Sequence, residues 1–166
     1  MPYDPAAHHR RSIRLPGYDY SQPGWYFITA CATRKRPVFG LLDGTGVTLN
    51  ICGAFVRDAW LALPKRFAHV ATGDYIVMPD HFHGLLQLLP RDADAEPCEP
   101  LGKIVAYFEY NTTSAINSWR AERHGAAPAQ VWQRNFYEHI VRDEQEHEAF
   151  RFYMAENPRR AQLAQE

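Results

Sequence analysis

The segments with strand and helix character alternate along this chain in an order that few folds accommodate. Aromatic and β-branched residues bounded by turn residues predict strands over 25–32, 70–77, 82–88 and 131–141. The loop between residues 34 and 46 leaves room for a short hairpin around Asp43 and Gly44.

Apolar residues at helical spacing predict two helices, over 50–63 with Asn50 as the N-cap and over 101–122. A third helix is expected to begin after Asp143 and to end before Pro158. The order β-α-β-β-α-β-α predicts an α+β fold of the ferredoxin-like, split βαβ type. In this sandwich an antiparallel sheet carries helices on one face, and the C-terminal helix is an addition to it.

The length of 166 residues favours one domain, which we expect to span residues 25–160 after an irregular arm over 1–24. No apolar run reaches the roughly 20 residues of a membrane helix, and no secretory signal is recognisable. Three cysteines without CxxC spacing argue against a zinc knuckle or a disulfide framework. These features favour a protein of the reducing cytoplasm.

The charge of the chain is unevenly distributed although its net value is only −1. Residues 1–40 hold six basic and two acidic side chains, and acidic residues gather over 90–100 and 138–148. A basic N-terminal third could contact phosphates, but a solvated surface is the commoner explanation for such a run.

The most distinctive local motif is His81-Phe82-His83. In a strand, residues two apart point to the same face, so both imidazoles would converge while Phe82 enters the core. Two neutral imidazoles make half of a divalent-metal site. An isolated pair of this kind is also compatible with two surface histidines.

Tyr153 and Asn157 offer a partner for these histidines. Residues four apart on a helix share one face, so the Asn157 amide could complete a metal site beside the Tyr153 phenol. Alternatively, Tyr153 packs on the core and Asn157 ends the helix before Pro158. A site of this composition suits phosphoryl transfer, with Mg²⁺ or Mn²⁺ polarising a phosphate oxygen and tyrosine as the nucleophile.

The chain resembles the REP-associated tyrosine transposases, a branch of the single-tyrosine transposases in the His-hydrophobic-His endonuclease superfamily. The resemblance covers about residues 10–160 and depends on five blocks in the expected order: RRSIRLPGYDYS from Arg10, WYFIT from Trp25, MPDHFHG from Met78, VWQRNFYEHIVRD from Val131 and YMAENP from Tyr153.

This resemblance implies catalytic roles for Tyr153, His81 and His83. His81, His83 and Asn157 would hold the metal, and Tyr153 would form a 5′-phosphotyrosine link and leave a free 3′-hydroxyl. The implied partner is single-stranded or hairpin DNA, typically palindromic repeats, bound on the nucleoid by a monomer or a homodimer. Candidate DNA contacts are Arg10, Arg11, Arg14, Tyr18, Tyr20, Arg34, Lys35, Arg36 and Arg134.

Two alternatives remain at this stage. Tyr137 is a rival nucleophile, although Val141 stands where an amide partner would be needed. The chain could also be a non-catalytic binder of single strands or hairpins, which would stack bases on sheet aromatics such as Trp25, Tyr26 and Phe27.

Overall fold

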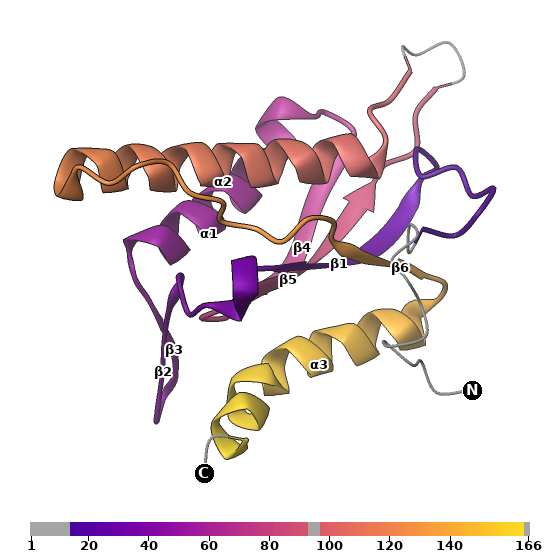
Figure 1. Ribbon diagram of the computed structural model, residues 1–166. Helices are drawn as coiled ribbons and strands as arrows, with labels where there is room; N and C mark the ends of the chain where they lie inside the picture. Colours follow the sequence, from indigo (N-terminus) through magenta and orange to yellow (C-terminus); the bar gives the residue numbers. More distant parts are fainter. Residues whose placement is uncertain (1–13, 93–96, 165–166) are drawn as a thin grey trace.

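Four antiparallel strands form the sheet on which the rest of the molecule is assembled (Figure 1). The computed structural model describes residues 14–92 and 97–164. Its elements are β1 (Gly24–Cys31), the short 3-10 helix η1 (Thr33–Lys35), β2 (Gly40–Asp43), β3 (Gly46–Leu49), α1 (Ile51–Arg66), β4 (Val70–Val77), β5 (His81–Leu88), α2 (Leu101–His124), β6 (Tyr137–Val141) and α3 (Glu144–Leu163).

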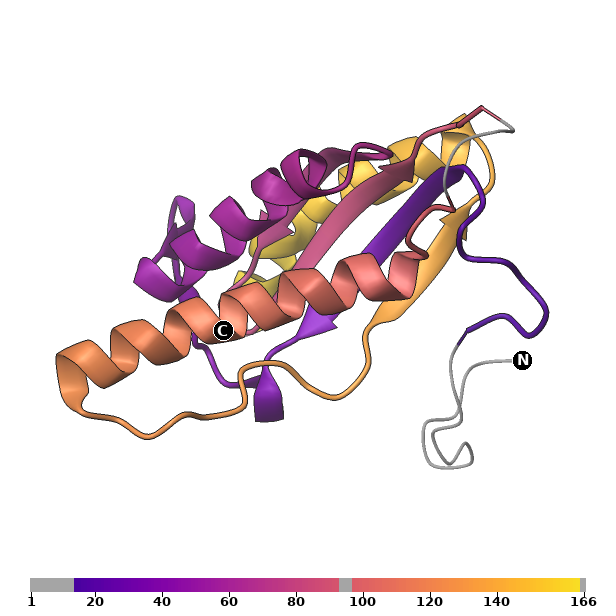
Figure 2. The ribbon, with the colours of Figure 1, turned by 90° about the horizontal axis from the view of Figure 1, so that it is seen from above.

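The strand order β4-β5-β1-β6 confirms the predicted ferredoxin-like arrangement. Helices α1 and α2 cover one face of the sheet, and α3 lies across the other (Figures 1 and 2). The hairpin predicted around Asp43 is present as the separate pair β2–β3. Within the described residues, no helix combines the length and apolar character that a membrane crossing requires.

The main core lies between the sheet and the pair α1–α2. Trp60 of α1, Phe82 of β5 and Phe108 of α2 are fully buried, and their ring centroids lie 4.7 to 5.6 Å apart. Burial of each such ring contributes roughly 2–3 kcal/mol. A smaller apolar cluster of Phe27, Leu85 and Met154 holds α3 against the opposite face.

Both predicted N-caps are formed. The Asn50 side chain accepts a hydrogen bond from Gly53 N at 3.0 Å, and Asp143 accepts one from Glu146 N at 2.8 Å. Each cap satisfies a backbone donor that the first turn of a helix leaves unpaired. The Asp143 cap fixes where α3 begins and therefore the phase of the side chains that follow.

Two predicted boundaries were wrong. The last strand begins at Tyr137 instead of residue 131, because Asn135 has a left-handed backbone with φ of 70° that interrupts the extended chain. Helix α3 continues through Pro158 to Leu163. The Gln162 side chain donates to Asp43 O at 2.7 Å, and this tertiary contact anchors the extra turn.

The described part of the predicted arm packs on the domain. The Tyr18 and Tyr26 hydroxyls are hydrogen-bonded at 3.2 Å, and Leu15 N donates to the Tyr20 hydroxyl at 2.9 Å. Tyr18 and Tyr20 both contact the main core. Residues 14–23 are therefore held against the domain by these two tyrosines.

Candidate metal and nucleophile site

His81 and His83 lie on the face of β5 that α3 covers, and their ring centroids are 4.7 Å apart. Phe82, between them, points to the opposite face and packs against Trp60. His81 is partly exposed, whereas His83 is only 4% exposed. The alternation expected of a strand thus brings the two imidazoles together and gives one of them a buried position.

Each imidazole uses Nδ1 for a protein partner. His81 Nδ1 lies 2.6 Å from Asp80 Oδ1, and His83 Nδ1 lies 2.7 Å from Thr29 Oγ1. His83 Nε2 is buried and has no hydrogen-bond partner among the described residues. An orphaned ring nitrogen of this kind is the atom that a metal ion would use, because the partner on Nδ1 fixes the ring orientation.

The protonation state of His83 suits metal ligation. Burial, together with the nearby His81, lowers the pKa of His83 to about 3. The ring is therefore neutral at physiological pH, and no proton competes with a cation for Nε2.

Two ring contacts hold the first half of helix α3 against β1. His147 lies against Trp25 with centroids 4.8 Å apart, and Phe150 stacks on Phe27 at 4.1 Å. One turn later, the Tyr153 ring lies 5.3 Å from the His83 ring. The phenol is thereby carried to the histidine pair by the same helix that closes this face of the sheet.

Asn157 follows Tyr153 by four residues and is 8% exposed, which is unusual for an amide. The helix continues to Gln162 at the β2–β3 hairpin. That hairpin adjoins the start of β5, because Phe39 N donates to Pro79 O at 2.9 Å. Asn157 thus lies on α3 between Tyr153 and the residues that contact the hairpin, and no hydrogen bond joins its side chain to His81 or His83 among the described residues.

Tyr153 is accessible as well as adjacent to the histidines. Its side chain is 36% exposed, and the Arg160 guanidinium carbon lies 5.9 Å from its ring centroid. A cation at this distance favours negative charge developing near the phenol.

Tyr137, the rival nucleophile, occupies a related position. In the sheet, Thr29 pairs with His83 on one side and with Tyr137 on the other, so the three residues form one row. Tyr137 is 49% exposed but lies two strands away from His83, roughly 10 Å between backbones. Tyr153 contacts the His83 ring directly and is the better placed of the two.

The candidate DNA contacts are not gathered in one cluster. Arg10 and Arg11 lie outside the described residues. Arg14 lies 5.9 and 5.7 Å from the ring centroids of Tyr20 and Phe136. Among these candidates, four basic residues that follow β1 or precede β6 are exposed: Arg34, Lys35, Arg36 and Arg134.

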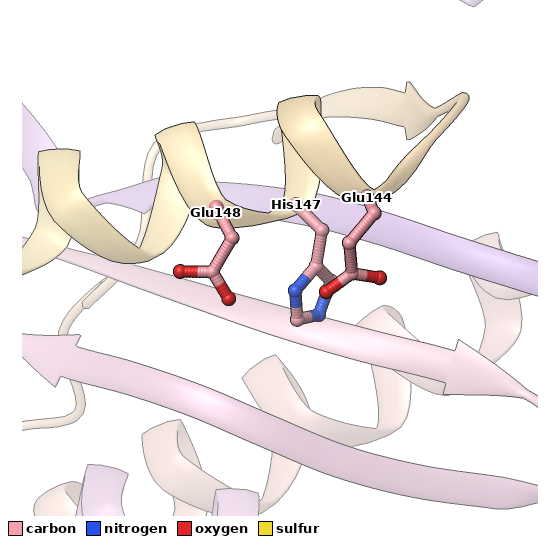
Figure 3. Close-up of side chains that lie close together, drawn as sticks. All are labelled: Glu144, His147 and Glu148. Atoms are coloured by element: carbon pink, nitrogen blue, oxygen red, sulfur yellow. The ribbon is translucent and has the colours of Figure 1, made fainter.

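A second group could hold a metal and was missed from the sequence (Figure 3). Ligand atoms of Glu144, His147 and Glu148 on α3 lie within 4.8 Å of one another. Their i, i+3, i+4 spacing is the signal that could have revealed them. This group lies at the start of α3, away from Tyr153, and Glu148 also accepts a hydrogen bond from Arg151 at 2.8 Å.

The aromatic residues of the base-stacking alternative are covered. Tyr26 is fully buried under α1 and α2, and Phe27 is 7% exposed beneath α3. Trp25 packs against His147. Since helices cover both faces of the sheet, these rings are not free to stack on bases as an open sheet would allow.

Comparisons with known proteins find similar chains both in sequence and in structure. No family model matches the chain. An uncharacterised protein of Haemophilus influenzae is 34% identical over 171 residues, which cover 94% of this chain and 92% of that protein.

The solved structure of a REP-associated tyrosine transposase bound to a REP hairpin is similar with a TM-score of 0.60 and 18% identity. The match covers 92% of this chain and 74% of that one. A candidate transposase of Deinococcus radiodurans matches with a TM-score of 0.50 and 16% identity over 87% of this chain and 96% of its own. The first of these likenesses confirms the expected fold.

Proposed function

We propose that this chain is a metal-dependent single-tyrosine transposase. It belongs to one family with the Haemophilus influenzae protein, and it has the fold of a REP-associated tyrosine transposase. It would cleave and rejoin single-stranded or hairpin DNA. The observation that carries the proposal is the contact of the Tyr153 ring with His83, beside a second histidine.

The proposed metal ligands are His81, His83 and Asn157. Both histidines occupy Nδ1 with protein partners, and His83 Nε2 has none among the residues described. Two imidazoles and one amide oxygen fit Mn²⁺, or Mg²⁺ with more of its shell supplied by water. When bound, the ion would polarise a non-bridging oxygen of the scissile phosphate and orient the phosphate for in-line attack.

Tyr153 would perform the covalent step. Its phenolic oxygen forms a bond to phosphorus, the bond from phosphorus to the 3′-oxygen breaks, and that oxygen takes up a proton as a free hydroxyl. The products are a 5′-phosphotyrosine and a DNA 3′-end. Attack of a 3′-hydroxyl on the phosphotyrosine reverses these bond changes and rejoins a strand without an external energy source.

Hairpin DNA is the partner that this proposal favours. The structural relative described above is bound to a REP hairpin. The exposed basic residues Arg34, Lys35 and Arg36 follow β1 at Cys31, which pairs with His81 in the sheet. Positive charge beside the candidate centre suits a phosphate backbone.

The proposal is tested with a 3′-labelled hairpin oligonucleotide carrying single-stranded flanks, incubated with the protein and Mn²⁺ or Mg²⁺. We expect a protein–DNA adduct that survives denaturing electrophoresis. Tyr153→Phe should abolish it, whereas Tyr137→Phe, the matched change in the same row as His83, should preserve it. An adduct formed by Tyr153→Phe at the wild-type level would refute the assignment of the nucleophile.

A further inference from the structure

A pocket on the far side of the sheet from Tyr153 has the composition of an anion site. The cavity is about 470 Å³ and is lined by η1 and the residues after it, by α2, and by the segment before Trp132. Three of its lining residues are arginines, Arg34, Arg36 and Arg120, and none of the lining residues is acidic.

The three guanidinium groups are not neutralised by neighbours. Within residues 14–92 and 97–164, no ion pair and no side-chain hydrogen bond joins Arg34, Arg36 or Arg120 to a carboxylate. All three arginines line the same hollow, so their positive charges surround one space. Their mutual repulsion would be relieved by an anion in the pocket.

The walls of the pocket are joined by hydrogen bonds. Thr33 N donates to Val131 O at 2.7 Å, which links η1 to the segment before Trp132. The Asn117 amide donates to Ala129 O at 3.0 Å and accepts from Ala129 N at 3.1 Å, which links that segment to α2. The pocket is thus built before any ligand arrives.

The backbone that presents Arg34 is strained, at that residue and at its neighbour Lys35. Arg34 and Lys35 have φ of 57° and 49°, in the left-handed region that side-chain-bearing residues rarely adopt. Lys35 N donates to Ala32 O at 2.9 Å, and this contact helps to hold the turn. Strain of this kind is common where a chain is shaped to bind a ligand.

From these observations we infer that the pocket binds an unpaired nucleotide of single-stranded DNA. Its phosphate would contact the arginines, and its base would lie against the apolar wall formed by Val38 and Ile116. The volume suits a ligand larger than an isolated phosphate. This inference rests on the proposed function, because it takes DNA as the partner.

The position of the pocket agrees with this partner. Ala32 N donates to Asp80 O at 2.8 Å, so the turn that carries Arg34 and Arg36 begins at the end of β5 where His81 lies. A strand leaving the histidine site at this end could pass around the sheet into the pocket. The pocket would then hold DNA beside the cleavage point and select unpaired over paired nucleotides.

Binding is measured by fluorescence anisotropy of a labelled 12-nucleotide single strand in EDTA, with Tyr153→Phe as the background. We expect Arg36→Gln/Arg120→Gln to weaken binding about tenfold and to lower the slope of log Kd against log salt by roughly 0.7, since the arginines contact one phosphate and each phosphate contributes about 0.7. Arg57→Gln/Arg123→Gln removes the same charge outside the pocket and should change Kd less than about twofold. Thermal melting of both doubles checks folding, and Arg120→Lys serves as a milder variant.

Cross-linking locates the bound base. A single strand with one 5-bromodeoxyuridine should give cross-linked peptides from 33–38 or 129–131, and thymidine 5′-monophosphate should compete where thymidine does not. Equal weakening by the two doubles, or cross-links only elsewhere, would overturn the inference. The binding assay contains EDTA and lacks the Tyr153 nucleophile, so it does not depend on catalysis. If the pocket substitutions do not weaken binding more than the control substitutions, the pocket assignment fails. If binding depends on the pocket but the wild type forms no adduct, the proposed transposase activity fails instead.

Discussion

Thr29 and His83 lie opposite each other in β1 and β5, and the Thr29 hydroxyl is 2.7 Å from His83 Nδ1. His83 is nearly fully buried, so this is the contact that orients its ring. With Nδ1 engaged by Thr29, Nε2 is directed away from the strand pair. A hydroxyl one strand away thus controls which nitrogen faces the candidate centre.

Replacing Thr29 should therefore weaken metal binding. We expect Thr29→Val, which keeps the branched shape but removes the hydroxyl, to lower Mn²⁺ affinity by about tenfold. Thr29→Ser keeps the hydroxyl and should bind Mn²⁺ nearly as well as the wild type. Isothermal titration calorimetry measures both, and an unchanged affinity in Thr29→Val would show that the hydroxyl does not orient the ligand.

Two groups of side chains could bind a cation, and single substitutions separate them. His83→Ala should abolish the tighter Mn²⁺ site, because it removes the buried orphaned nitrogen. His147→Ala removes the histidine of the group in Figure 3 and should leave that site and adduct formation intact. Electron paramagnetic resonance of titrated Mn²⁺ counts the ions bound. If His147→Ala abolished the tighter site and His83→Ala did not, the metal site would have to be assigned to the group at the start of α3.

Much of the fold could be predicted because local signals agreed with the tertiary structure. Asn50 and Asp143 marked the helix starts correctly, since a cap is a contact with residues only three positions away. The pairing of His81 with His83 followed from the two-residue period of a strand. These predictions needed no knowledge of distant parts of the chain.

Two of the features that could not be predicted involve contacts between distant residues. Helix α3 passes Pro158 because Gln162 reaches the carbonyl of Asp43, more than a hundred positions earlier. Likewise, the sequence gives no sign that Arg120 lines the same pocket as Arg34. Such neighbours are determined by how the sheet and helices pack, which periodicity along one segment does not encode.

Gly84 lies between the histidine motif and the core, and its lack of a side chain is required there. A Cβ at this position would lie 2.6 Å from Trp60 Cζ2 and 2.8 Å from Phe82 Cζ. Both rings are fully buried and cannot move aside freely. We expect Gly84→Ala to lower the free energy of unfolding by about 1–3 kcal/mol, measured by urea denaturation.

Gly44 provides the control for this substitution. A Cβ there would meet no heavy atom within 4 Å, so Gly44→Ala should leave the urea midpoint nearly unchanged. If Gly84→Ala were equally harmless, the packing between Trp60 and β5 would have to be looser than the structure indicates.

Glu109 is a partly buried carboxyl group whose ionisation lowers the stability of the folded protein. It lies on α2, its Oε1 is buried without a hydrogen-bond partner among the described residues, and burial raises its pKa to about 7 from an ordinary 4.5. The folded state therefore holds the proton more tightly than the unfolded state does. Below the pKa of Glu109 in the unfolded chain, the carboxyl is protonated in both states and does not lower the free energy of unfolding. As the pH rises above that value toward and through 7, the unfolded chain ionises more readily than the folded protein, and the free energy of unfolding falls.

Glu109→Gln should remove this pH dependence, because the amide is neutral throughout. Relative to wild type, we expect the variant to gain little at pH 5 and more at pH 8.5, with a difference between the two gains on the order of 2 kcal/mol. Urea denaturation at the two pH values measures it. Glu122→Gln changes an exposed carboxylate on the same helix and should give the same result at both. A gain for Glu109→Gln that did not grow with pH would mean that Glu109 is ionised in the folded protein at little cost, and that a partner stabilises its charge.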